Sequence, residues 1–184
     1  AAYAFAFIDF KYKNIWFLVF LSTLMIPWEA TIIPNYLLIR KLGWTDTFQG
    51  LVMPFLATGF GTFLLRQFFL KIPKELHDAA VIDGCSHLHF LTQIVLPLGR
   101  PALGTLAVYS FLQTYNQYLW PLLITNNEKM RTVQIGIALL QDEERFMFNN
   151  VMAGVVLIMI PTFLLFIISN KQLIRGLTAG AVKG

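Results

Sequence analysis

The feature that most constrains this chain is an apolar segment near its C-terminus, Val151–Ile168, which contains 18 residues and no charged side chain. The hydrocarbon core of a bilayer is about 30 Å thick, and about 20 predominantly apolar helical residues cross it. A helix on the surface of a soluble protein keeps a polar face, and this segment has none. The segment therefore predicts a transmembrane helix.

Three further segments are long and apolar enough to be spans, over about 15–33, 51–70 and 102–124. Only 13% of the residues are charged, against about 25% in soluble domains. A buried bundle in a soluble protein is therefore the weaker alternative. The sequence predicts an all-α polytopic bundle, with residues 1–184 forming one transmembrane domain. Residues 1–8 fit the tail of a further span, so we expect N-terminal spans to be absent.

The basic residues of the loops indicate an orientation, because loops between four spans alternate sides and Lys and Arg concentrate in cytoplasmic loops. One side holds nine of the 14 basic residues, which are Lys11, Lys13, Arg66, Lys71, Lys74, Arg100, Lys171, Arg175 and Lys183. The other side holds Arg40, Lys41, Lys129, Arg131 and Arg145. We expect the first side, with both visible chain ends and the loop 71–97, to be cytoplasmic.

The loop 71–97 is too polar to span the membrane, and its pattern predicts two short helices. Pro73 suits the first turn of a helix, and Gly84 suits its C-terminal cap because glycine adopts a positive φ at little cost. Ser86 is a suitable N-cap for a second helix, which we expect Pro97 to stop. The loop is therefore expected to be a helix, a glycine turn and a helix.

Two small residues, Ala79 and Ala80, lie in the first of these expected helices, close to the turn. Small side chains at this place would let another protein approach closely. The alternative is a solvated connector that only links two spans, and the residue pattern leaves both interpretations open.

The same loop carries a resemblance to a known family. Asp78-Ala79-Ala80 is followed by Asp83-Gly84 and, after nine further residues, by Ile94-Val95-Leu96-Pro97. This spacing resembles the EAA motif of ABC importer permeases, with Asp78 in the place of the usual Glu. The stretches 118–122 and 175–184 are similar to carbohydrate-uptake permeases, a group that includes maltose-type and glycerol-3-phosphate-type subunits. The resemblance covers essentially the whole chain.

The resemblance implies a permease of the ABC importer type in a bacterial inner membrane, for a sugar, an oligosaccharide or glycerol-3-phosphate. The first loop helix would be a coupling helix that docks on a separate ATPase. The residues that would carry coupling are Asp78, Ala79, Ala80, Asp83 and Gly84. Closure of the ATPase pair would switch the permease pair between inward-facing and outward-facing states.

The implied partners are a second permease subunit in a heterodimer, two ATPase subunits and an extracytoplasmic solute-binding protein. That binding protein would dock on the outer loops around Arg40–Thr47 and Asn126–Asn150. The partner ATPase would use ATP-Mg, and this chain would bind no cofactor. Membrane lipid would surround the chain, and we expect no nucleic-acid partner.

Polar and aromatic residues in the third predicted span point to a solute pathway. Tyr109, Gln113, Asn116 and Trp120 share one face of a continuous helix, and Gln117 lies beside them. Polar groups that face lipid are costly, so this face should look into the bundle or a pathway. Amides and aromatic rings suit the hydroxyls and flat surfaces of a sugar or polyol. Hydrogen bonding that only holds helices together is the open alternative.

Glu29 is a further pathway candidate, because an acidic residue inside a membrane span is costly and so often functional. It lies between Pro27 and Pro34 in the first predicted span. The alternative is that the two prolines kink or end the helix and place Glu29 near water.

A membrane-embedded enzyme that acts on a lipid or isoprenoid through the loop's Asp and His residues is the second hypothesis, and a passive channel is the third. The enzyme hypothesis predicts that Asp83→Asn abolishes chemistry in the isolated chain. No G-x-x-x-x-G-K-[ST] sequence is present, so nucleotide chemistry would come from another subunit. His77, His87 and His89 form a weak metal-binding pattern, so we expect no metal site, and the single Cys85 allows no internal disulfide.

Overall fold

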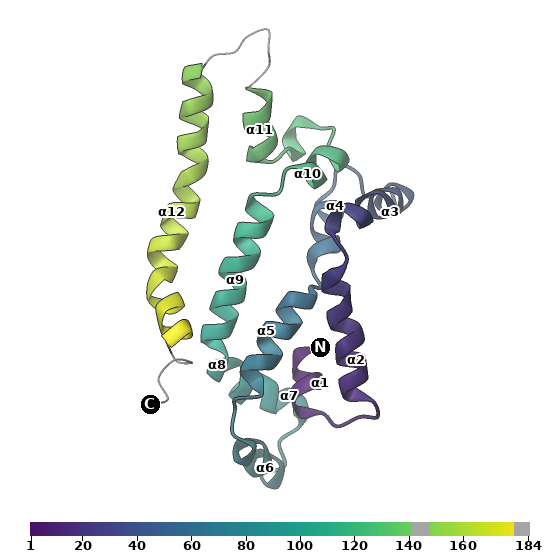
Figure 1. Ribbon diagram of the computed structural model, residues 1–184, viewed down its shortest axis with the longest axis vertical. Coiled ribbons are helices and arrows are strands. Elements are labelled where there is room, and N and C mark those ends of the chain that lie inside the picture. The colour runs from purple at the N-terminus through teal and green to yellow at the C-terminus, as the bar shows by residue number, and fades with distance from the viewer. Residues whose placement is uncertain (141–147, 179–184) are drawn as a thin grey trace. The chain divides into compact units, whose positions relative to one another are not determined.

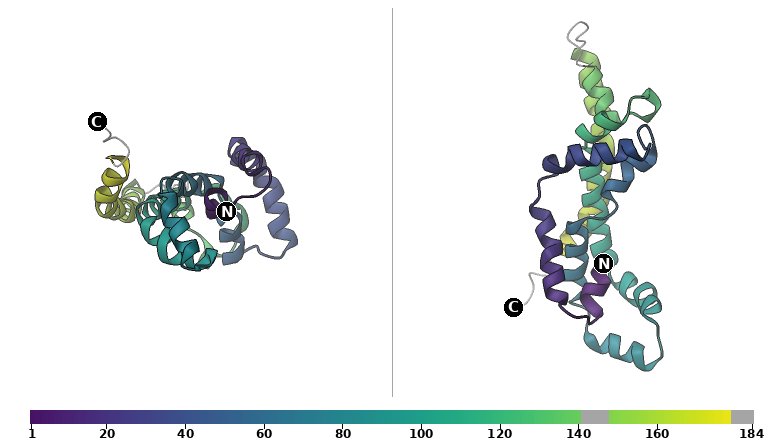
Figure 2. Two further views of the ribbon diagram at one scale, coloured as in Figure 1. Left: turned by 90° about the horizontal axis from the view of Figure 1, so that it is seen from below. Right: turned by 90° about the vertical axis from the view of Figure 1, so that its right-hand side faces the viewer.

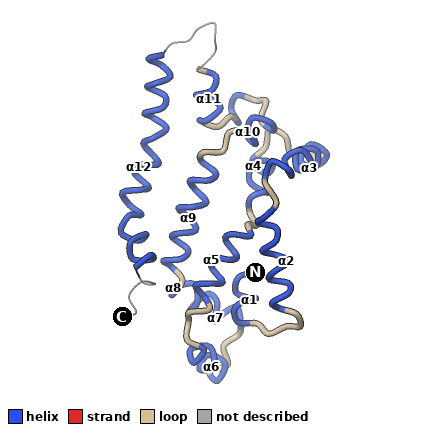
Figure 3. The backbone as a smooth tube through the Cα atoms, in the orientation of Figure 1, coloured by secondary structure: helices blue, strands red, loops and turns tan. Residues whose placement is uncertain are grey.

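Figure 1 shows the computed structural model of the chain, which describes residues 1–140 and 148–178, with side chains up to residue 169. Every regular element in these ranges is helical, as Figure 3 shows, and this confirms the predicted all-α class. Contacts divide the chain into two compact units. Unit 1 comprises Ala1–Ile26, Thr58–Ala107 and the described backbone of 171–178, and unit 2 comprises Pro27–Ala57 and Val108–Asn170.

Unit 1 is built around α5, against which α1, α2 and η1 pack. Its helices are α1 (Ala2–Phe7), α2 (Lys13–Ser22), η1 (Thr23–Met25), α5 (Gly59–Phe69), α6 (Lys74–Ile82), α7 (His87–Phe90), the π-helical η3 (Leu91–Val95), α8 (Leu96–Leu98) and the first part of α9 (Arg100–Tyr115). Thr58 begins α5 because its hydroxyl accepts a hydrogen bond from the Gly61 N–H. The right-hand view of Figure 2 shows α6 projecting from the lower end of this unit.

The buried core of unit 1 joins the first helix of the chain to the loop between α5 and α9. Its buried residues are Ala2, Phe69, Ile72, Ala80, Phe90 and Val95. They come from α1, α5, the turn after α5, α6, α7 and η3, so burying them brings residues far apart in sequence into contact. This core therefore positions the loop that the sequence singles out.

Unit 2 has a separate core centred on a fully buried tryptophan. Its helices are α3 (Trp28–Lys41), α4 (Phe48–Val52), η2 (Met53–Phe55), the rest of α9, α10 (Leu119–Ile124), η4 (Glu128–Met130), α11 (Val133–Leu139) and most of α12 (Phe148–Thr178). The Trp120 ring packs edge-on against Trp28 and Phe55, with ring centroids 5.6 and 6.2 Å away. Ile32, Ile39 and Ile124 complete the buried set.

The fourth predicted span lies entirely within α12. Phe148–Ser169, 22 residues long, is the one helical segment of the described residues that is long and apolar enough to cross a membrane alone. Phe166, Ile167 and Ile168 are more than half exposed. Large apolar side chains in such numbers are rare on a water-facing surface. This face therefore suits contact with lipid or with other helices.

Each of the other three predicted spans is divided in the structure. The first is broken at Pro27, whose extended backbone (φ −60°, ψ 140°) separates η1 from α3. The second is broken just before Thr58, between η2 and α5. If each bent pair of helices counts as one span, the described residues hold up to four.

The third predicted span is broken in its C-terminal part, because α9 ends at Tyr115 and α10 begins only at Leu119. Pro121 explains the break. A proline ring clashes with the carbonyl four residues earlier in a continuous helix, and here that carbonyl belongs to Gln117. The Asn116 side-chain amide also donates a hydrogen bond to the Leu112 carbonyl, at 2.8 Å.

The bend that begins α9 depends on Gly99. A Cβ atom at this position would lie 2.9 Å from the Val95 carbonyl oxygen and 3.2 Å from the Phe69 ring. Only glycine fits a backbone approach this close without a shift of its neighbours. The chain therefore bends sharply at Gly99, between the helical run from α7 to α8 and the start of α9. The run from α7 to α8 is the C-terminal end of the candidate site.

Candidate functional site

The candidate site is the loop between α5 and α9, which begins with α6. Phe69 and Ile72 are buried and fix the exit of the chain from α5. Pro73 precedes the first residue of α6, where its missing N–H costs no helical hydrogen bond. Glu75 lies in the first turn, where a negative charge is favoured by the helix dipole. The predicted first helix of the loop is confirmed.

Gly84 ends α6 as predicted, with a positive φ of 73°. Its N–H donates to the Val81 carbonyl at 3.0 Å, and the Cys85 N–H donates to the Ala80 carbonyl at 2.9 Å. These two bonds satisfy carbonyls that the helix end would leave unpaired. A Cβ atom on Gly84 would meet no heavy atom within 4 Å. The glycine is therefore needed for its backbone conformation and not for space.

The second loop helix begins where the sequence predicts it, because the Ser86 hydroxyl accepts a hydrogen bond from the His89 N–H at 3.3 Å. The expectation that Pro97 stops this helix is wrong. The chain stays helical to Leu98 through the wider π-helical turn Leu91–Val95. A π-helical turn shifts the hydrogen bonds by one residue, which accommodates a proline just after it.

The five motif residues divide into one core residue and four surface residues. The side chain of Ala80 is buried among Phe69, Phe90 and Val95. Asp78, Ala79, Asp83 and Gly84 are exposed. Ala80 therefore holds α6 against the rest of unit 1, and the other four positions are open to contact by another molecule.

The tip of α6 presents large apolar side chains to its surroundings. Ile82 is 85% exposed, Val81 57% and, across the glycine turn, Leu88 71%. Three exposed apolar side chains around one turn form a patch that another protein would bury favourably. This observation favours docking over the plain connector that the sequence left open.

The loop is held against α1 by contacts that the sequence gave no reason to expect. The Tyr3 hydroxyl lies 3.0 Å from Nδ1 of His87. The Phe7 ring stacks on the His77 ring, with centroids 5.8 Å apart and an interplanar angle of 18°. Tyr3 and Phe7 are four residues apart, so both point from the same face of α1. That spacing is the one signal that could have indicated the contact.

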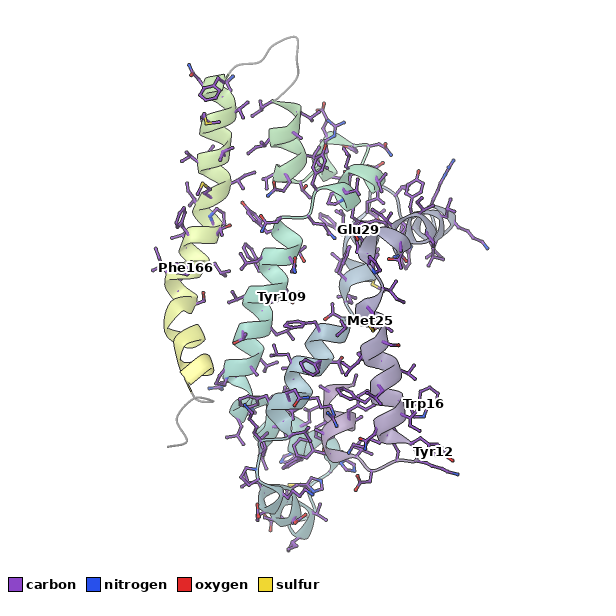
Figure 4. All side chains as sticks on the ribbon, viewed as in Figure 1. Tyr12, Trp16, Met25, Glu29, Tyr109 and Phe166 are labelled. Atoms are coloured by element: carbon purple, nitrogen blue, oxygen red, sulfur yellow. The ribbon has the colours of Figure 1, made fainter. Side chains whose placement is uncertain are left out.

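Of the predicted pathway residues, Tyr109 and Gln113 share a face of α9, and Figure 4 labels Tyr109 there. The Gln113 amide nitrogen donates to the Tyr109 hydroxyl at 2.9 Å, and both residues are exposed. Asn116 is exposed and Gln117 half-buried, but both lie beyond the end of α9. The predicted face of Tyr109, Gln113, Asn116 and Trp120 is therefore interrupted where α9 ends, after Tyr115.

Trp120 does not line a surface, which corrects its expected role in the pathway. Its side chain is fully buried, and Nε1 donates to the Gly50 carbonyl at 3.2 Å. The break before α10 turns this residue into the core of unit 2. A packing role explains all of its contacts.

Glu29 lies in the first turn of α3, where Figure 4 labels it, and it is exposed. Pro27 ends the preceding helical segment, so the carboxylate sits at a helix N-terminus, where the dipole stabilises it. This is the local geometry that the alternative interpretation of Glu29 expected. Pro34 does not end α3, which runs on to Lys41.

Asp46 joins the two loops of unit 2 that were predicted to dock a binding protein. Its Oδ1 accepts hydrogen bonds from the backbone N–H groups of Asn126 and Asn127, at 2.6 and 2.7 Å. The pKa of the Asp46 carboxyl lies below its ordinary value of 3.8, first because of the Asn127 N–H and also because of Asn126. Of the predicted docking segment Asn126–Asn150, residues 141–147 lie outside the described residues, as does Arg145 among the basic residues of that side.

The histidines of the loop do not belong to a metal-binding cluster of the described side chains. Within residues 1–140 and 148–169, no group of three or more His, Cys, Asp or Glu side chains is placed to hold a metal ion. His77 and His87 instead stack on each other, with centroids 6.3 Å apart, and contact the aromatic rings of unit 1. Their described contacts are those of packing residues.

The helical fold, the long apolar α12 and the helix–glycine–helix loop are features of a membrane-embedded helical protein. The chain belongs to the family of binding-protein-dependent transport system inner membrane components, whose pattern matches residues 1–178. This confirms the resemblance that the loop motif carries.

Two curated relatives show how close the similarity is. The chain is 38% identical over 182 residues to the arabinooligosaccharides transport system permease protein AraQ of Halalkalibacterium halodurans, covering 99% of this chain and 65% of that protein. It is 39% identical over 179 residues to the sn-glycerol-3-phosphate transport system permease protein UgpE of Brucella abortus, covering 96% of this chain and 64% of that protein. The chain thus spans somewhat less than two thirds of the length of these relatives.

A solved structure has the same fold. It is the crystal structure of a bacterial ABC transporter involved in the import of the acidic polysaccharide alginate. The match has a TM-score of 0.80 at 24% sequence identity, and it covers 92% of this chain and 65% of that chain. The breaks within the predicted spans therefore occur in a fold that a solved transporter shares.

Proposed function

We propose that this chain is part of the permease subunit of an ATP-driven importer for a carbohydrate-type solute, in the range of sugars, oligosaccharides and glycerol-3-phosphate. The observation that carries the proposal is the family match over residues 1–178. The two relatives are named for arabinooligosaccharide and glycerol-3-phosphate transport. In this role the chain forms part of the solute path and binds a separate ATPase through α6.

The exposed tip of α6 supports the coupling role. Val81, Ile82 and Leu88 supply apolar surface, while Asp78 and Asp83 add charge at its edge. Ala80 and the turn at Gly84 hold α6 against the core of unit 1. A displacement of the α6 tip by a bound ATPase would therefore also displace α1 and α5. A rigid helix on a bundle with two stable arrangements is what such coupling needs.

The partners in this proposal are a second permease subunit, two ATPase subunits that use ATP-Mg, and an extracytoplasmic solute-binding protein. The loop 71–97 and both visible ends face the cytoplasm, and the Asp46 loop faces the binding protein. The enzyme alternative has no support, because the relatives are transport permeases. A passive channel has no observation in its favour.

Tyr109, Gln113, Asn116 and Gln117 remain the proposed solute contacts. Tyr109 and Gln113 already share a hydrogen bond, so the pair offers a hydroxyl and an amide in fixed relation. Such groups bind sugar hydroxyls with several hydrogen bonds at once. Trp120 is left out because it is buried, and Glu29 stays a weaker candidate at the start of α3.

The test is co-purification of the full-length gene product from gently solubilised membranes, with bound proteins identified by mass. Wild type is compared with Gly84→Asp and with Gly43→Asp. Both glycines have a positive φ, 73° and 70°, and a Cβ atom at either meets no heavy atom within 4 Å. The two substitutions therefore carry the same backbone strain in different loops.

We expect a Walker-motif ATPase to accompany wild type and Gly43→Asp, and to be lost with Gly84→Asp. Absence of an ATPase from all three samples would contradict the proposed function. Equal loss in both variants would contradict the docking role of the loop. The solute class is then checked by measuring uptake of labelled arabinooligosaccharide and glycerol-3-phosphate in cells that express the complete transporter.

A further inference from the structure

Unit 1 contains a cavity of about 750 Å³, which shares only Asp78 with the proposed coupling residues. It lies among α1, the turn into α2, the end of α5 and the start of α6. Its charged lining residues are Lys13, Arg66, Lys74, Asp9 and Asp78. Three basic against two acidic side chains leave the lining with an excess of positive charge, which suits an anionic group in a membrane protein.

Arg66 is held in place inside this cavity. Its Nε donates to the Phe5 carbonyl at 3.2 Å, and its guanidinium carbon lies 3.9 Å from the centroid of the Phe17 ring. Among the described contacts, none uses the two terminal nitrogens of the guanidinium. A planar guanidinium fixed in this way is pre-organised to bind phosphate oxygens with those nitrogens.

The two carboxylates of the cavity each have a basic neighbour already. Asp9 lies 3.5 Å from the Lys13 ammonium, which also donates to the Ala6 carbonyl. Asp78 lies 3.7 Å from Nδ1 of His77. Arg66 and Lys74 are therefore the cations that remain to meet an anion from outside the chain.

An apolar groove of about 260 Å³ adjoins the cavity and shares Tyr12 and Ile15 with it. Trp16 and Val19 complete its lining, and all four side chains are more than half exposed. Ile15, Trp16 and Val19 lie at helical spacing on one face of α2. Figure 4 shows Tyr12 and Trp16 pointing outward from the N-terminal end of α2. Tyr and Trp side chains are enriched where a membrane meets water.

We propose that the cavity and groove together bind one anionic phospholipid. The headgroup phosphate contacts Arg66 and Lys74, and an acyl chain lies in the groove along Ile15, Trp16 and Val19. A soluble anion would use the cations and leave the apolar groove empty, whereas a phospholipid satisfies both. The site rests on the inner-membrane location of the family and is independent of the proposed transport activity.

The test uses the full-length protein in detergent, titrated with phosphatidylglycerol, with phosphatidylcholine and with inorganic phosphate, and bound ligand is counted by native mass spectrometry. We expect phosphatidylglycerol to bind more tightly than phosphatidylcholine, and phosphate alone not to compete. Lys74→Gln should weaken phosphatidylglycerol binding about fivefold, the usual contribution of one basic residue at a membrane surface. The matched control Lys71→Gln removes an equal charge three residues earlier, outside the cavity lining, and should leave binding unchanged.

The groove is tested separately on α2. Trp16→Ala should weaken phosphatidylglycerol binding, whereas Leu18→Ala, on the same helix but outside the groove, should not. Arg66→Gln should abolish binding, and a melting curve shows whether that variant is folded. Equal effects of Lys74→Gln and Lys71→Gln, or equal affinities for the two lipids, would overturn the site. Tight binding of phosphate alone that displaces the lipid would replace it with a soluble-anion site.

Discussion

Asp46 shows at the scale of one residue how a single carboxylate organises a loop pair. It accepts two short backbone hydrogen bonds from Asn126 and Asn127, and its own N–H donates to the Ile124 carbonyl at 2.9 Å. Its backbone has a positive φ of 53°, which aspartate tolerates better than most residues. The loop pair of unit 2 therefore depends on the ionised form of one side chain.

The loop pair should loosen in acid. A carboxyl whose pKa is lower in the folded than in the unfolded state stabilises the folded form at pH values above the unfolded pKa. That contribution is lost as the pH falls through the lowered folded pKa, here below the ordinary value of 3.8. At higher pH, the backbone amides of segment 125–128 should exchange more slowly in wild type than in Asp46→Ala. As the pH falls into this range, the wild-type exchange rates should approach those of Asp46→Ala until the two are equal. A constant difference down to pH 2 would contradict the role of the charge.

Trp120 is the second residue for which the structure makes a sharp prediction. Trp120→Ala should destabilise the protein by about 3–5 kcal/mol, because a fully buried ring leaves a cavity. Trp120→Phe, which keeps an aromatic ring but loses the bond to Gly50, should cost about 1–3 kcal/mol. Thermal melting of the purified protein measures both. A Trp120→Phe protein of wild-type stability and altered solute preference would restore the pathway interpretation.

At the scale of elements, α1 and the loop helices form one mechanical link in unit 1. Tyr3 bonds to His87 of α7, and Phe7 stacks on His77 of α6. Movement of α6 therefore reaches α1 through side chains as well as through the chain itself. In the proposed transporter, these contacts would carry motion from the ATPase to the bundle.

Tyr3→Phe should loosen this link while keeping the ring packing. One neutral hydrogen bond contributes about 0.5–1.5 kcal/mol. Its loss should therefore change the equilibrium constant between the arrangement of the loop that has this bond and the one that lacks it by up to about tenfold. We expect more ATP hydrolysed per solute imported in reconstituted complexes, with normal assembly. The control Tyr36→Phe removes a hydroxyl from α3 of unit 2 and should leave this ratio unchanged. Equal ratios in all three proteins would show that the bond plays no part in coupling.

At the scale of the whole molecule, the basic residues predict which loops face the cytoplasm. Ile82 at the tip of α6 and Lys129 in η4 are both exposed, and they belong to loops expected on opposite sides. In a Cys85→Ser background, Ile82→Cys should react with an impermeant thiol reagent in inside-out vesicles only. Lys129→Cys should react in right-side-out vesicles only. Labelling of both residues from one side would contradict the four-span topology.

The functional loop was predictable because its signals are local. Pro73, Gly84 and Ser86 act on the helix ends next to them, and each lies at such an end, although Pro73 precedes the first turn in which it was expected. The candidate pathway was less predictable, because the expected face assumed a helix without a break. Pro121 acts on the turn before it, which separates Asn116 and Gln117 from α9.

The sequence by itself determined the helical class, the long apolar span of α12 and the glycine turn of the loop, because composition and short-range chemistry decide these features. Only the tertiary structure decided that Ala80 is buried while Ala79 is exposed. It also joined Tyr3 to His87, 84 residues away, and placed Arg66 beside Phe5 and Phe17. Such contacts depend on how separate helices pack. A local pattern such as the spacing of Tyr3 and Phe7 marks a helix face but does not specify which segment packs against it.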